Sequence, residues 1–491
     1  MSAIRWVCLS DLHFGAENSL LTNLDGGSLE VDTSKASPVL EQLVSCLAEL
    51  IQPSAAAPLP SLVLNGDVIE FALATDNVAA MAFDRFVDLA FDPARPLFGP
   101  TVYYVPGNHD HHMWEVARER QYSDYVASVP ADRDLAEPWH VTRMFERPGD
   151  HGAPGDELPT AELLDALMRR RLGNDAVGVK IAYPNLGFTG ADGSATVVFH
   201  HGHFIESIYL LMTRLRLATF PASAEGVNVW DWESDNFAWI DFFWSTLGRS
   251  GESGQDVGVI YNMLQSPEAL KWLAGNLGGT LSQNVPGPRV ASRAASPAVK
   301  RLLGSVAGRA SQLERHTPGA TLSDDAAAGL VRYLSGPLRA QLEGEHVGAS
   351  AADVRFVFGH THKPFERSQL IDGFAKPVTQ FNTGGWVVDT ASTNPMQGAA
   401  VVLVDAAANV ASLRMYNQAD SPSAYAVHLA EDPGGAPNPL RDELSGALDL
   451  AAEPWTSFSA AVAAAVDQRH RALPQIISHA MAAPEPPPHQ P

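Results

Sequence analysis

Cysteine is scarce in this chain, which has only Cys8 and Cys46 among its 491 residues. Cys8 lies in an apolar run typical of a buried strand, and Cys46 lies on the apolar side of a predicted helix. Neither indicates a disulfide framework or an oxidising compartment. Residues 1–10 lack the basic region, apolar core and cleavage site of a secretory signal peptide. No stretch reaches the ~18 uncharged apolar residues of a membrane-spanning helix. We therefore expect a cytoplasmic protein without a transmembrane segment.

Basic residues are the minority among the charged ones. The chain has 33 Lys+Arg against 56 Asp+Glu, so its formal net charge is −23. Nucleic acids and most membrane surfaces are anionic, and this charge therefore argues against a nucleic-acid partner. Hydrophobic residues make up 45% and charged residues 18%, a balance that excludes wholesale disorder. The length allows about three domains, or one large domain with insertions.

Strand and helix signals alternate at the start of the chain. Short apolar runs predict strands over residues 4–10, 61–65 and 102–105, and a 3.6-residue apolar period predicts helices over 37–51 and 77–90. A β-α-β-α-β series favours a largely parallel sheet with right-handed crossovers. The sequence therefore predicts an α/β fold.

Strand signals return in the second half of the chain. The expected strands cover residues 195–199, 354–358, 377–381, 399–404 and 412–416. A long, mostly helical insertion interrupts them, and a Pro-rich tail over 483–491 is expected to be disordered. The predicted organisation is an N-terminal part of one domain (1–203), the insertion (204–352), the C-terminal part of that domain (353–431) and a C-terminal extension (432–491).

Five polar clusters stand where predicted strands end. They read Asp11-Leu12-His13, Gly66-Asp67, Gly107-Asn108-His109-Asp110, His201-Gly202-His203 and Gly359-His360-Thr361-His362. Residues i and i+2 of an extended chain point to the same side, so the D-x-H and H-x-H pairs can each present two ligands to one point. The carboxyl ends of strands are where open α/β sheets build their sites.

The donor atoms in these clusters are imidazole nitrogens, carboxylate oxygens and one carboxamide, with no thiolate. Such a donor set is typical of sites for Mn²⁺, Fe or Zn²⁺, and not of a soft-metal site or a structural cysteine site. Six or seven ligands exceed the need of one four-coordinate ion, so two ions that share a bridging carboxylate are the simplest interpretation. Paired metals about 3.5–4 Å apart promote in-line displacement at phosphorus and acidify a bridging water.

In this order, D-x-H, GD, GNHD, HGH and GHTH resemble the motifs of the calcineurin-like metallophosphoesterase superfamily. The resemblance covers residues 1–115, the strand before His201, and residues 354–416. It implies a four-layer α/β/β/α metallophosphoesterase sandwich, here with a mostly helical insertion. It also implies a metal-dependent phosphoric ester hydrolase acting on a small phosphorylated substrate. A metal-bridging hydroxide would attack a phosphodiester, pyrophosphate or phosphomonoester bond. We expect two divalent ions, with Mn²⁺ ahead of Fe or Zn²⁺.

The resemblance assigns a role to each motif residue. One metal would be held by Asp11, His13 and His362, the other by Asn108, His201 and His360, with Asp67 bridging the two. His109 would stay off the metals and would stabilise or protonate the leaving group. Glu70 would orient His109, or would be a plain surface acid or an acid at a helix start.

Three points stay open in the sequence. His200 and His203 remain alternatives to His201 as the ligand, and His111 and His112 are expected to be solvated loop residues. The insertion carries five of the ten Trp residues, namely Trp230, Trp232, Trp239, Trp244 and Trp272. They predict the core of a helical subdomain or, alternatively, a lid that encloses an organic leaving group. The alternative function is a non-catalytic scaffold of the same fold, although such relatives usually lose a ligand that is present here.

Overall fold

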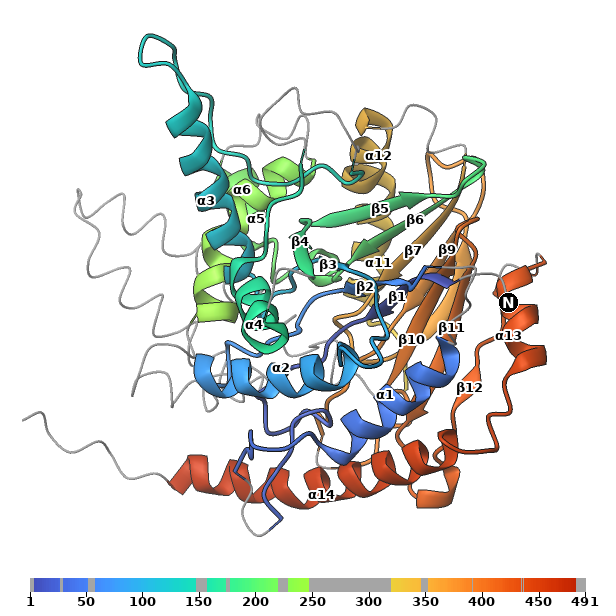
Figure 1. The fold of residues 1–491 in the computed structure, drawn as a ribbon. Coiled ribbons are helices and arrows are strands. Elements are labelled where there is room, and N and C mark those ends of the chain that lie inside the picture. The colour runs from blue at the N-terminus through green and yellow to red at the C-terminus, as the bar shows by residue number, and fades with distance from the viewer. Residues whose placement is uncertain are drawn as a thin grey trace, which may run out of the picture.

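The computed structural model describes residues 4–26, 30–51, 58–146, 157–173, 177–219, 228–246, 319–345, 352–390, 392–433, 435 and 437–482. Within these residues no helix combines the length and the apolar character that crossing a membrane requires. The chain forms a mixed α/β structure with two sheets (Figure 1).

The larger sheet has seven strands in the order β12-β11-β10-β1-β2-β3-β4. These strands are β1 (Ile4–Leu9), β2 (Ser61–Leu64), β3 (Thr101–Tyr104), β4 (Gly178–Ile181), β10 (Gly398–Asp405), β11 (Val410–Asn417) and β12 (His428–Leu429). The pairs β1–β2, β2–β3 and β3–β4 are parallel, whereas β10, β11 and β12 add antiparallel strands on the other side of β1. The parallel half confirms the predicted β-α-β-α-β series.

The smaller sheet has five strands in the order β5-β6-β7-β9-β8. They are β5 (Asn185–Thr189), β6 (Ala195–His200), β7 (Asp353–Phe358), β8 (Phe365–Gln369) and β9 (Val378–Asn382). The central strands β6, β7 and β9 run parallel and confirm the expected strands, while the edge strands β5 and β8 are antiparallel.

Helices connect these strands and form the insertion. In the domain body they are α1 (Pro38–Leu50), α2 (Asp76–Ala90), α3 (His112–Ser128), α4 (Glu162–Leu172), α13 (Pro439–Ala447) and α14 (Trp455–Ala482), with the short 3₁₀ turn η8 (Pro422–Ala424). Between β6 and β7, mostly within the segment expected to be an insertion (204–352), they are η1 (His203–Ile205), α5 (Leu211–Thr219), α6 (Val229–Ile240), the π-helical turn η3 (Asp241–Thr246), α11 (Asp324–Tyr333), the π-helical turn η6 (Leu334–Leu338) and α12 (Arg339–Glu345). The helix α1 begins as its sequence indicates, because the Ser37 hydroxyl accepts a hydrogen bond from Leu40 N at 3.1 Å and Pro38 occupies the first turn.

The two sheets share a buried cluster. The larger sheet contributes Cys8, Val63 and Val402, and the smaller sheet contributes Phe199 and Val357. Each such side chain adds about 1.5–3 kcal/mol of hydrophobic stabilisation when it leaves water. The carboxyl ends of the central strands of both sheets are therefore held together by a common core.

Helices cover the other face of each sheet. Val7 follows the alternation of its strand to the opposite face from Cys8, where it belongs to a cluster that includes Leu43 of α1 and Phe86 of α2. On the smaller sheet, Phe356 belongs to a cluster with Leu330 of α11. Figure 1 shows α1, α2 and α14 together along one side of the larger sheet, and α1 and α14 are in contact.

Part of the insertion's tryptophan set is buried. Trp232 and Trp244 are almost fully buried in the cluster that contains Phe356 and Leu330. Trp239 is half-buried and donates its indole N–H to Ile208 O at 3.0 Å. Trp230 is 43% exposed. Trp232, Trp239 and Trp244 therefore agree with the packing interpretation, whereas Trp230 does not. Trp272 and the expected disordered tail at 483–491 lie outside the described residues.

Candidate metal centre

Five of the seven candidate ligands share an unusual backbone conformation. A positive φ occurs at Asp11 (53°), His13 (47°), Asp67 (50°), His360 (71°) and His362 (57°). Among the described residues other than glycine, Ala408 alone adds to this set. The left-handed region costs an L-residue about 1–2 kcal/mol, so the surrounding structure must enforce it. The enforcing contacts include backbone hydrogen bonds of 2.9 Å from Asp11 N to Gly66 O and from His13 N to Asp67 O.

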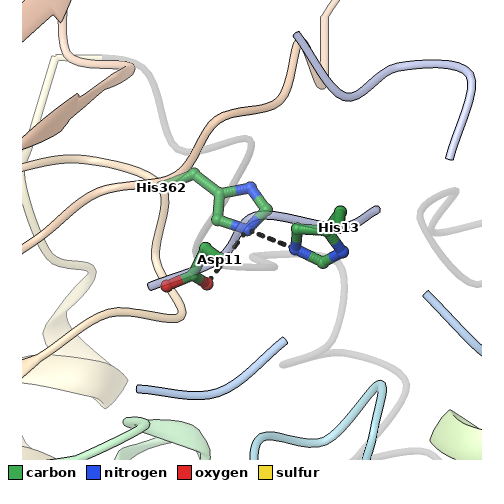
Figure 2. Close-up of side chains that lie close together, drawn as sticks. All are labelled: Asp11, His13 and His362. Carbon is green, nitrogen blue, oxygen red and sulfur yellow. Dashed lines mark hydrogen bonds and ion pairs between the residues drawn. The ribbon is translucent and has the colours of Figure 1, made fainter. Parts of the chain in front are cut away.

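The first group of donor atoms consists of Asp11, His13 and His362. Figure 2 shows the His362 ring between the other two side chains. Its Nε2 lies 3.4 Å from Asp11 Oδ1 and 3.3 Å from His13 Nε2. All three residues are buried, and one donor atom from each lies within 4.8 Å of the others. Asp67 Oδ2 approaches the same point, at 3.7 Å from His13 Nε2.

The second group lies on the other side of Asp67. His201 Nε2 is 3.3 Å from Asp67 Oδ2, 3.2 Å from His360 Nδ1 and 3.1 Å from Asn108 Oδ1. The structure therefore brings all seven predicted ligands together, and a single Asp67 oxygen faces both groups. The sequence leaves His200 and His203 as alternatives to His201, and it is the His201 ring that lies in the second group.

Each imidazole of the two groups contacts an acceptor through its outer nitrogen. The pairs are His13 Nδ1 with Glu70 Oε2 (2.7 Å), His362 Nδ1 with Asp389 Oδ2 (2.6 Å), His360 Nε2 with Glu206 Oε1 (2.6 Å) and His201 Nδ1 with Asn65 O (3.3 Å). A carboxylate or carbonyl oxygen can only accept, so each outer nitrogen carries the proton. In the neutral ring, the inner nitrogen is then an acceptor.

Acceptors therefore face acceptors inside both groups. With neutral rings, His13 Nε2 points its lone pair at His362 Nε2, and His201 Nε2 does the same toward His360 Nδ1 and the Asn108 oxygen. Such contacts repel unless a proton or a cation lies between them. Without an ion, the raised pKa of His201 keeps a second proton on its ring at pH 7 instead. The donor types and the fixed tautomers fit divalent ions. These buried His, Asp and Glu groups could hold metal ions.

Electrostatics support a cation at this point. Burial opposes ionisation of Asp67, but the nearby His201 and His109 hold the pKa of its carboxyl well below the usual range. Burial alone would lower the pKa of His201, yet the Asp67 and Asp11 carboxylates raise it to about 9. The pocket thus has a negative potential that a bound cation would neutralise.

His109 and Glu70 lie together beside the first group. His109 Nδ1 contacts Glu70 Oε1 at 2.8 Å, and the other Glu70 oxygen contacts His13. Oε1 also accepts backbone N–H groups from Ala72 (2.8 Å) and Leu73 (3.0 Å). Glu70 is fully buried, so its interpretation as a plain surface acid is wrong. One carboxylate orients both a candidate metal ligand and the neighbouring imidazole.

His111 and His112 differ from the expectation of solvated loop residues. His111 is fully buried, and its Nε2 lies 2.9 Å from Glu233 Oε1 of the insertion helix α6. His112 is half-buried, with Nδ1 3.1 Å from Asp241 Oδ1. The expectation failed because both carboxylates lie more than a hundred residues further along the chain.

The two neighbours of His201 are buried outside the ligand groups. His203 Nε2 lies 3.0 Å from the Tyr183 hydroxyl, and the His200 ring packs against Tyr333 with centroids 4.6 Å apart. Burial lowers the pKa of both rings well below the ordinary histidine value, and nearby imidazoles lower it further. Both are therefore neutral at pH 7.

Sequence reasoning missed several supporting residues. Asp110, the last residue of the GNHD motif, accepts N–H groups from Gly107 (2.6 Å), Val68 (2.7 Å) and Asp67 (3.2 Å) and so ties two motifs together. A Cβ at Gly107 would lie 2.2 Å from Asp67 Oδ1, which accounts for glycine there. The motif could have indicated Asp110. The partners Asp389 and Glu206 carry no local signal.

Comparisons with known proteins add little to this description. No family model matches the chain, and no curated protein sequence matches it. Among solved structures, the crystal structure of a phosphopantetheinyl hydrolase from Mycobacterium tuberculosis aligns with 16% identity and a TM-score of 0.23, covering 78% of this chain and 91% of that chain. A TM-score of this size does not establish a shared fold, so the proposals below rest on the residues of this chain.

Proposed function

We propose that this chain is a dimetal phosphoesterase that hydrolyses a phosphodiester, pyrophosphate or phosphomonoester bond, with diesters and pyrophosphates slightly ahead. The observation that carries the proposal is the pair of buried groups whose acceptor atoms face one another across the shared Asp67 carboxylate. We further propose that the two sheets and their helices form the four-layer α/β/β/α sandwich of the calcineurin-like metallophosphoesterases. In this proposal residues 1–203 and 353–431 build one catalytic domain.

The proposed ligands divide as the two groups do. Asp11, His13 and His362 would hold one divalent ion, and Asn108, His201 and His360 would hold the other, with Asp67 between them. We propose Mn²⁺ as the first candidate and Fe or Zn²⁺ as alternatives, because the set has no thiolate. When bound, such ions polarise phosphoryl oxygens and acidify a water nucleophile.

His109 would supply the proton of the reaction. Glu70 accepts the proton of His109 Nδ1 at 2.8 Å, which directs the opposite ring nitrogen away from the carboxylate. His109 N donates to Asp67 Oδ1 at 2.8 Å, so the loop that carries the imidazole is fixed to the bridging carboxylate. From this position His109 Nε2 would contact the phosphate and, as the imidazolium, protonate the leaving oxygen. Glu70 would hold the orientation of the ring and stabilise the charge of the imidazolium.

Hydrolysis of two model esters tests the proposal. Bis-p-nitrophenyl phosphate and p-nitrophenyl phosphate are compared with Mn²⁺ added or chelated, and an Asp67→Asn variant runs in parallel. We expect metal-dependent turnover that the variant loses, because the amide lowers the charge shared by both groups. The ratio of diester to monoester turnover then directs the substrate search.

Two other results are informative. Two metals bound per chain without turnover of either ester would indicate a pocket selective for another substrate. That result would support the metal ligands but not the hydrolysis of these esters. No turnover together with no bound metal would contradict the proposal and favour a non-catalytic scaffold.

A further inference from the structure

The insertion contacts the second donor group directly through Glu206. This residue follows η1, is 9% exposed and lies with Oε1 2.6 Å from His360 Nε2. Its carboxylate fixes which His360 nitrogen is available to a ligand. Glu206 therefore controls the orientation and basicity of one proposed metal ligand.

The helix α11 of the insertion fixes the backbone around Glu206. Ser207 N donates to Asp325 Oδ2 at 3.1 Å, at the start of α11. Further along the same helix, a Cβ added at Gly329 would lie 1.7 Å from Ile205 O, so the two backbones touch. Only glycine permits this approach. The position of Glu206 thus depends on the packing of a helix about 120 residues later in the chain.

The insertion also holds the chain that leaves Asn108 and His109. The helix α3 begins at His112, and its N-cap residue makes no side-chain capping bond. The cap comes instead from the π-helical turn η3, where Ser245 Oγ accepts from His112 N at 3.1 Å. Glu233 of α6 contacts His111 Nε2 at 2.9 Å and accepts from the Tyr183 hydroxyl at 3.0 Å.

Among the described residues, two carboxylates outside residues 204–352 contact imidazoles of the first donor group. Glu70 contacts His13 and Asp389 contacts His362, and neither carboxylate belongs to the insertion. One insertion contact lies nearby, from Lys363 Nζ to Ala320 O at 3.1 Å, but it involves the next side chain and not an imidazole. In the part of the insertion that the structure describes, Glu206 is the carboxylate in contact with an imidazole of the two groups, and that imidazole belongs to the second group.

We propose that the insertion is a positioning element for one of the two metal sites: Glu206 holds the His360 ring, and Glu233 and Ser245 hold the segment that follows Asn108. Affinity at the Asn108–His201–His360 site then depends on these three residues of the insertion. This inference rests on the proposed function for the identity of the ligands as metal ligands.

Glu206→Gln and Asp389→Asn form a matched pair of variants. Each replaces one carboxylate that contacts one imidazole, at about the same distance, in opposite groups. Bound Mn²⁺ is measured on the full chain by equilibrium dialysis with elemental analysis. Loss of such a partner typically lowers metal affinity about 10–100-fold. We expect each variant to keep one tight ion and to bind the other about 10–100-fold more weakly, and the double variant to weaken both.

Electron paramagnetic resonance at one Mn²⁺ per chain separates a positioning role from a merely structural one. Glu206→Gln should give the six-line signal of an isolated ion, and excess Mn²⁺ should restore the signal of a coupled pair. Gly329→Ala removes no polar group, yet it should weaken the same ion as Glu206→Gln. Adding it to Glu206→Gln should therefore cause little further loss.

The outcomes separate the inference from the proposed function. Wild-type affinity for both ions in Glu206→Gln would overturn the inference and leave the proposed function intact. The inference also fails if the double variant loses no more than one single variant, since both carboxylates would then act on one ion. A wild-type chain that binds no Mn²⁺, Fe²⁺ or Zn²⁺ would overturn the proposed function and the inference with it.

Discussion

Replacement of His111 by Gln should make the stability of the protein respond differently to pH. Burial alone would lower the pKa of the His111 imidazole, but the Glu233 and Asp241 carboxylates more than offset it and raise the pKa to about 10. A group whose pKa is higher in the folded than in the unfolded state stabilises the fold. The stabilisation is complete at pH values below the unfolded-state pKa, and it is lost as the pH rises to the folded-state pKa. The relevant window therefore runs from pH 6.5 to about 10.

The size of the effect follows from the two pKa values. Each pH unit between them is worth about 1.4 kcal/mol, so the charged His111 contributes up to about 5 kcal/mol at pH 6 and almost nothing at pH 10. The free energy of unfolding of the wild type, minus that of His111→Gln, should fall by about 3–5 kcal/mol across this range. Urea denaturation followed by tryptophan fluorescence at pH 6, 8 and 9.5 measures the difference.

Two further variants make this test specific. Glu233→Gln removes the charge that His111 faces. The difference in free energy of unfolding between the wild type and this variant should therefore fall with pH nearly as much as the difference for His111→Gln. Tyr183→Phe removes the hydroxyl that donates to the other Glu233 oxygen without changing any charge below pH 10. It should destabilise the fold by about 1–2 kcal/mol, equally at all three pH values. A difference between wild type and His111→Gln that stays constant from pH 6 to 9.5 would refute the reasoning.

Three other outcomes are expected. His109→Gln should lower kcat about 10²–10⁴-fold for an ester with an alkoxide leaving group and far less for p-nitrophenolate, which needs no proton; equal losses for both esters would contradict the acid role. Arg469→Met should destabilise the fold by about 2–4 kcal/mol in urea, because the buried guanidinium donates to Ser19 O (2.6 Å) and Thr22 O (2.7 Å) and their loss leaves two buried carbonyls. Addition of a chelator should lower the melting temperature of the wild type more than that of Asp67→Asn, since a ligand that binds only the folded chain stabilises it.

The convergence of the motif residues could be predicted because it depends on local rules. Each motif follows a strand, and parallel strands end at a common edge. The alternation expected of an extended chain does not explain why Asp11 and His13 meet, because both residues have a positive φ, as do His360 and His362. The sequence did not predict the edge strands β5 and β8. The segment at β8, Phe-Glu-Arg-Ser-Gln, has a single apolar residue and so lacks the alternating pattern of a strand. It is a strand because its backbone pairs with β9.

The partners of the site could not be predicted, because they depend on contacts between distant segments. Glu206 meets His360 across 154 residues, and Glu233 meets His111 across 122. His111 therefore resembles a solvated loop residue in the sequence, although it is fully buried. The helix α14 could have been predicted, because Trp455, Phe458, Val462 and Val466 recur every three to four residues and alanine favours helices. Its packing against α1 could not, since that contact joins the two ends of the chain.

Anomalous X-ray diffraction from crystals grown with Mn²⁺ tests the central claim most directly. We predict two anomalous peaks about 3.5–4 Å apart. One should lie among Asp11, His13 and His362, the other among Asn108, His201 and His360, with Asp67 contacting both. A single peak, or peaks remote from Asp67, would contradict the dimetal account.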